Sequence, residues 1–163
     1  MESRATLLGH PIHPMLIVLP LGLLIAAVVF DGVYLWRGSP TFAELAYWNI
    51  GAGVVGGLLA AVFGLIDWLA IPSGTRAKRI GLLHGAANVL VVVTFALVWL
   101  MRGDRLDYAP TTGLFVLEIG ALVLASVGGW LGGELVDRLG VGVHDGANLD
   151  APSSLSGRPA RLR

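Results

Sequence analysis

Four long apolar segments, near residues 14–36, 45–70, 80–101 and 112–136, place the strongest constraint on how this chain can fold. Each reaches about the 20 residues that a helix needs to cross roughly 30 Å of hydrocarbon. Mean hydropathy is +0.77 and 13% of the residues are charged, against about 25% in a typical soluble domain. We therefore predict an all-α membrane protein, a bundle of four transmembrane helices over residues 1–149.

Positive residues outside these segments predict the orientation of the bundle. The N-terminus, the loop at 71–79 and the C-terminal tail together hold eight Lys and Arg residues, and the other side holds Arg37, Arg102 and Arg105. Positive loops stay in the cytoplasm, so we expect both termini on the cytoplasmic side of a bacterial inner membrane. The tail at 150–163 is rich in Ser, Pro, Ala and Arg, and we expect it to be disordered.

The composition also excludes several kinds of chemistry. The chain has no cysteine, which excludes disulfides, c-type haem, cysteine-ligated iron–sulfur clusters and thiolate copper within it. Its formal net charge is zero, so no field of one sign recruits nucleic acid. We find no nucleophile paired with a base and no phosphate-binding loop, and predict no catalytic residue. Any metal must be held by His, Asp, Glu or Met.

A His-Pro-Ile-His-Pro run precedes the first apolar segment. His10 and His13 each stand before a proline, which favours an extended, polyproline-like path with both imidazoles on one side. Pro14 suits the first turn of a helix, so we expect His13 to cap that helix. A helix N-terminus disfavours positive charge nearby, so we expect a neutral imidazole, the form that binds metal.

The alternating direction of four spans brings further polar residues to this end. Six potential ligands are expected there: His10, His13, Asp67, His84, Glu134 and His144. Asn88 lies one helical turn after His84 and could orient its ring. Each of the six potential ligands, like Asn88, also has a structural interpretation: a helix-start motif, an interhelical polar pair, a solvated loop, or an ion pair with nearby Lys or Arg. Ionisable groups at membrane depth are costly and mark function by default.

Small residues recur at a spacing that lets helices approach closely. Gly53–Gly57, Gly128–Gly132 and Gly129–Gly133 are each four residues apart, a pattern typical of helix packing in lipid. Room for a flat cofactor between helices is the alternative. The two halves also resemble each other weakly, since a histidine leads into two spans that end at an acidic residue in each half. This pattern favours a duplicated helical hairpin with parallel halves.

With these motifs in view, the sequence resembles the bacterial membrane family DUF2231. The resemblance covers residues 8–144 and is carried by the run at 9–14, the segments at 64–68 and 132–136, His84, and the glycines at 140–143. It implies a four-helix membrane domain without a settled activity. Some members resemble partners of redox modules such as Rieske-type or cytochrome c domains, which favours electron transfer. This chain has no such module.

These observations lead to a first hypothesis and two rivals. The first is a redox metal centre in the membrane, either b-type haem with His13 and His84 as axial ligands or a Zn, Cu or Fe ion held by three histidines and a carboxylate. His10 and His144 are the alternative ligands, Asp67 is a supporting acceptor, and a partner protein exchanges electrons. The main rival is a non-enzymatic membrane scaffold or subunit with structural histidines. A transporter ranks third, and a homodimer stays open.

Overall fold

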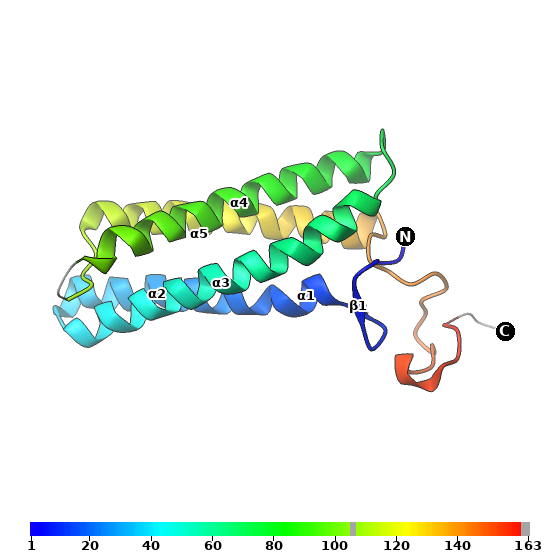
Figure 1. The fold of residues 1–163 in the computed structure, drawn as a ribbon, viewed down its shortest axis with the longest axis horizontal. Coiled ribbons are helices and arrows are strands. Elements are labelled where there is room, and N and C mark those ends of the chain that lie inside the picture. Colours follow the sequence, from blue (N-terminus) through cyan, green and yellow to red (C-terminus); the bar gives the residue numbers. More distant parts are fainter. Residues whose placement is uncertain (105–106, 161–163) are drawn as a thin grey trace.

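The computed structural model describes residues 1–104 and 107–160 and forms a bundle of long helices lying side by side (Figure 1). Helices α1 (Ile12–Leu16) and α2 (Val18–Arg37) make the first span, followed by α3 (Pro40–Ala70), α4 (Arg76–Gly103) and α5 (Thr112–Gly133), which continues into η1 (Glu134–Arg138). All four spans are long and apolar enough to cross a membrane, with mean hydropathy of 2.0 or more. The predicted four-helix membrane fold is confirmed.

Local sequence signals explain where the helices break and turn. The step between α1 and α2 follows Leu16, whose carbonyl would normally bond to the N–H four residues later, at Pro20, which has none. Gly38 ends α2 with a φ of 69°, a conformation that glycine adopts without strain. Thr75 begins α4 by accepting a hydrogen bond from the backbone N–H of Lys78.

The first span starts earlier than the sequence predicted. A short hairpin of β1 (Thr6–Leu7) and β2 (His10–Pro11) precedes it, and Ile12 N–H bonds to the Ala5 carbonyl. The hairpin ends in a helix that begins at Ile12, so His13 lies inside the first turn and does not cap it. The expected polyproline path from His10 to His13 is therefore wrong.

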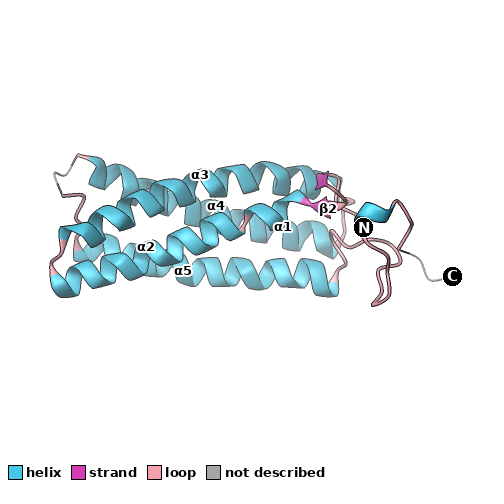
Figure 2. Cartoon of the chain, turned by 90° about the horizontal axis from the view of Figure 1, so that it is seen from below, coloured by secondary structure: helices cyan, strands magenta, loops and turns pink. Residues whose placement is uncertain are grey.

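The core lies between the helices, and the outer surface is apolar. Leu24, Ala27, Ile50, Phe95 and Val98 are among the buried residues that pack at the centre. Large aliphatic side chains on the outer faces of all four spans are exposed, as expected for a surface that contacts lipid. Figure 2 shows the helices running alongside one another for most of their length.

The two hairpins place equivalent residues at similar separations in the sequence. His84 in α4 follows His13 in α1 by 71 positions, and Gly132 in α5 follows Gly64 in α3 by 68. Each histidine packs against the corresponding glycine of its own hairpin. This repetition supports the predicted duplication with parallel halves.

The C-terminal segment returns to the N-terminal hairpin. Residues 151–160 include a short helical turn, η2 (Ser154–Ser156), and Ser154 lies against Gly9 and His10. Residues 161–163 lie outside the described residues, and disorder of the 150–163 tail stays a prediction. At the same end, the N-terminal amino group donates to the Gly140 carbonyl at 2.8 Å.

Candidate functional site

Two of the predicted ligands, His13 and His84, meet inside the bundle. Their ring centroids are 6.1 Å apart and the rings are nearly perpendicular, at 85°. One ring comes from the first turn of α1 and the other from the third turn of α4, and both are partly buried. The pair therefore joins the two repeated hairpins at the end of the bundle that carries the termini.

Each imidazole is fixed by the same kind of hydrogen bond. His13 Nδ1 lies 2.8 Å from the carbonyl oxygen of Ala60, and His84 Nδ1 lies 2.8 Å from that of Gly128. A carbonyl can only accept, so Nδ1 carries the proton in both rings. Nε2 is then the nitrogen that carries the lone pair when the ring is neutral.

Glycines on the facing helices make room for these rings. A Cβ at Gly64 would lie 3.0 Å from His13 Cε1, and one at Gly132 would lie 3.2 Å from His84 Cε1. Gly128 packs against the Asn88 amide in the same way, whereas Gly129 and Gly133 have no neighbour within 4 Å. The predicted packing role therefore holds for Gly128 and Gly132 and not for Gly129 and Gly133. The side chains of Asn88 and His84 cover the surfaces of Gly128 and Gly132 that a flat cofactor would need.

Asn88 contacts His84, as the one-turn spacing predicted. Its Nδ2 donates to the His84 backbone carbonyl at 2.8 Å and lies 3.4 Å from both ring nitrogens. The amide therefore rests against the imidazole and limits its rotation. Asn88 therefore acts by fixing the position of the His84 ring.

The other two histidines have partners at the surface. His10 Nε2 lies 3.3 Å from the Ser154 hydroxyl. His144 Nε2 donates to the Gly9 carbonyl at 2.9 Å, and its Nδ1 lies 3.1 Å from the Glu2 carboxylate. The Gly9 carbonyl and then Glu2 raise the pKa of His144, and the hydrogen bond from His144 lowers the pKa of Glu2.

The two predicted carboxylate ligands, Asp67 and Glu134, bind groups other than the histidines. Asp67 accepts hydrogen bonds from the Ser3 hydroxyl and from the backbone N–H groups of Arg4 and Ala5, and so anchors the N-terminal segment. Glu134 pairs with Arg76 across the α4 and α5 ends. The sequence had suggested ion pairs with nearby Lys or Arg, and Glu134 forms one with Arg76, whereas Asp67 binds the N-terminal segment.

The six expected ligands therefore do not form one set. Within residues 1–104 and 107–160, no three His, Asp or Glu side chains are grouped closely enough to hold a metal ion. The expected site of three histidines and a carboxylate is wrong for this arrangement, because the helix starts at Ile12 and sends His10 and His13 to different partners. Only His13, His84 and the supporting Asn88 come together.

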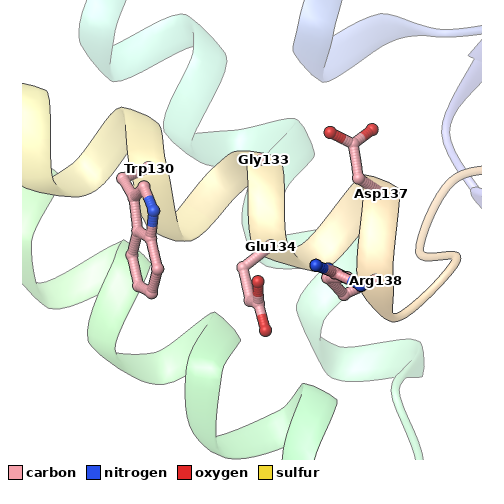
Figure 3. A pocket seen from close by; sticks show the side chains of 5 residues that line it. All are labelled: Trp130, Gly133, Glu134, Asp137 and Arg138. Carbon is pink, nitrogen blue, oxygen red and sulfur yellow. The ribbon is translucent and has the colours of Figure 1, made fainter.

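Two surface hollows at this end are lined by residues other than the histidine pair. One is lined by Trp130, Gly133, Glu134, Asp137 and Arg138, and in Figure 3 the Glu134 and Asp137 carboxylates point in opposite directions. Another is lined by Arg4 and by apolar residues of α3. Neither includes His13 or His84 in its lining.

A second polar cluster lies at the opposite end of the bundle and is fully buried. The side chains of Asp31 in α2, Arg102 in α4 and Glu118 in α5 have no exposed surface. Arg102 binds both Asp31 oxygens, at 2.6 and 2.9 Å, and Glu118 Oε1 at 3.3 Å. We refer to these three residues as the buried triad.

Sequence reasoning missed Arg102. The sequence placed Arg102 in the loop after the third span, but α4 continues to Gly103 and turns the guanidinium inward. Arg102 follows Asp31 by 71 positions, the offset that relates His84 to His13. That shared offset of 71 positions was the sequence signal that could have linked Arg102 to Asp31.

Comparison with known proteins now adds the family. A profile described as "Predicted membrane protein (DUF2231)" matches residues 9–145. The chain belongs to the DUF2231 family. The matched region of this DUF2231 chain contains both the histidine pair and the buried triad. No curated protein and no solved structure matches it.

Proposed function

We propose that this protein holds one redox-active transition-metal centre between His13 and His84, as the membrane subunit of an electron-transfer system. The observation that carries the proposal is the shared bonding of the two rings, in which both Nδ1–H groups are tied to backbone carbonyls. Metal-binding histidines are commonly oriented by this kind of bond, which leaves Nε2 for the metal.

The separation of the rings fits a single shared ion. Metal–nitrogen bonds are about 2.0–2.1 Å long, so one ion held by two imidazoles places the ring centroids about 5.2 Å apart at a tetrahedral angle and about 6.4 Å apart at a linear one. The observed 6.1 Å lies between these two values. Imidazole suits iron and copper, which are redox-active, as well as redox-inert zinc, and the remaining coordination positions would be filled by water or by a group from a partner.

The packing favours an ion over haem. A b-type haem would use His13 and His84 as its axial pair, but the macrocycle needs a slot between helices. Gly64 and Gly132 are covered by the imidazoles themselves, and Gly128 by Asn88. Haem would therefore require α3 and α5 to move away from these rings, whereas an ion needs no such slot.

We place the pair near the cytoplasmic face of a bacterial inner membrane. Eight positive residues flank the end that carries the termini. On the other side Arg102 is buried in the triad and no longer counts as a loop charge, which strengthens the asymmetry. This orientation would present the metal to a redox partner in the cytoplasm.

Purified full-length protein tests the proposal by elemental analysis and a visible absorption spectrum. We expect about one metal ion per chain, with strong loss in His13→Ala and in His84→Ala. His10→Ala is the matched control, because His10 lies outside the pair, and should keep the metal. Equal metal content in all four proteins would overturn the assignment, and a Soret band lost in the first two variants would replace the ion with haem.

The second candidate is a non-enzymatic membrane scaffold with structural histidines. It is favoured by the fact that each Nδ1 bond links the two helices of its own hairpin, as an interhelical bond in a packed bundle would. Metal-free wild-type protein that also fails to bind added Cu²⁺ or Zn²⁺, while His13→Ala and His84→Ala unfold more easily, would support this role.

A further inference from the structure

The buried triad holds more negative than positive groups. Two carboxyl groups, Asp31 and Glu118, share the one guanidinium of Arg102, and none of the three side chains reaches solvent. With both carboxyls ionised the cluster would carry an uncompensated negative charge inside the bundle. Such a charge is strongly disfavoured in a low-dielectric interior.

The two carboxyl groups are bound very differently. Asp31 receives a guanidinium N–H on each oxygen, at 2.6 and 2.9 Å. Glu118 receives one longer bond, at 3.3 Å, on Oε1 only. Asp31 is therefore the carboxylate that Arg102 neutralises, and Glu118 is the group left over.

One oxygen of Glu118 has no donor. Oε2 is buried and accepts no hydrogen bond from any residue that the structure describes. The other oxygen, Oε1, shares one guanidinium nitrogen with Asp31, because Arg102 Nη1 lies 2.6 Å from Asp31 Oδ2 and 3.3 Å from Glu118 Oε1. A proton on Glu118 would remove one of two negative charges held at this single donor, and a neutral acid is far less costly to bury than an unpaired carboxylate.

We propose that Glu118 is a proton-binding site, whose carboxyl is protonated and neutral while Asp31 stays ionised against Arg102. The proton comes from a hydronium ion in the solvent, so that one O–H bond of hydronium breaks, one carboxyl O–H bond forms and a water molecule is released. The triad then consists of one cation, one anion and one neutral acid, so its net charge is zero. Among the described residues, its other polar contacts are the backbone carbonyls of Ala43 and Tyr108, which accept from Arg102 and carry no charge.

This site is separate from the histidine pair. The two lie at opposite ends of the bundle, with buried apolar residues such as Phe95, Val91 and Leu24 between them. The proton site therefore does not rest on the proposed metal centre.

Infrared spectroscopy of the full-length protein in lipid vesicles tests the proposal directly. Protein labelled with ¹³C at the glutamate side-chain carboxyl should show a protonated-carboxyl C=O band at neutral pH that shifts with the label and disappears in Glu118→Gln. Glu44→Gln is the matched control, because Glu44 is exposed on α3 at the same end, and should keep the band.

Labelled wild-type protein decides the question even if Glu118→Gln fails to fold. Absence of a label-sensitive protonated-carboxyl band at neutral pH would overturn the proposal. So would a band that appears only after Na⁺ is removed, because a metal cation would then be balancing the second carboxylate.

Discussion

Replacing Arg102 by methionine removes the only positive charge of the buried triad. The substitution keeps an unbranched apolar stem in place but deletes five hydrogen bonds to described residues, three to carboxylates and two to backbone carbonyls. Asp31 is then left as a buried anion without a counter-charge. Breaking a buried ion pair in this way costs about 3–5 kcal/mol.

The Tyr108 carbonyl, which loses its donor, adds to this cost, whereas the Ala43 carbonyl lies inside α3 and keeps the helical N–H donor four residues later. An unsatisfied buried acceptor costs about 1–3 kcal/mol, although Asp31 can offset part of the loss by taking up a proton. We therefore expect Arg102→Met to lower the free energy of unfolding by at least about 3 kcal/mol. Asp31→Asn should cost less, because Arg102 can then pair with an ionised Glu118.

Reversible unfolding in mixed micelles, followed by tryptophan fluorescence, measures these differences. Arg37→Met is the matched control, because Arg37 is exposed at the same end of the bundle, and should unfold like the wild type. A charge-free variant that combines Arg102→Met, Asp31→Asn and Glu118→Gln should recover part of the loss. The reasoning is refuted if Arg102→Met is as stable as the control, or if Asp31→Asn is the more damaging substitution.

Two further predictions concern the end of the bundle that carries the termini. Gly132→Ala should destabilise the protein and broaden the His84 ring signals in NMR spectra, because the new Cβ would lie 3.2 Å from that ring; Gly129→Ala, with open space around it, should be neutral or slightly stabilising. Equal effects of the two substitutions would contradict this packing. The raised pKa of His144 means that its contacts stabilise the folded termini below about pH 6.5 and lose this effect as the pH rises through the raised value. NMR titration should show a higher pKa than that of an unperturbed histidine, lowered in Glu2→Gln, and a value unchanged by that substitution would exclude the contact.

The sequence was sufficient for the membrane fold because span length and hydropathy are local properties. Alternating topology was also enough to bring His13 and His84 to one end, and the one-turn spacing of Asn88 placed it against His84. The partners of His10 and His144 depended on the hairpin before α1 and on the path of the tail, which hydropathy does not report. Arg102 was mistaken for a loop charge because it lies at the edge of an apolar segment, where only packing distinguishes an inward from an outward side chain.

The guanidinium of Arg102 also bears on how the chain is assembled. It contacts α2 through Asp31, α3 through the Ala43 carbonyl and α5 through Glu118, so all four spans converge on one side chain of α4. During synthesis the first hairpin is made before that side chain exists, so its Asp31 has either to take up a proton or to stay near the polar interface until Arg102 arrives. The third span therefore completes the polar contacts of the first two.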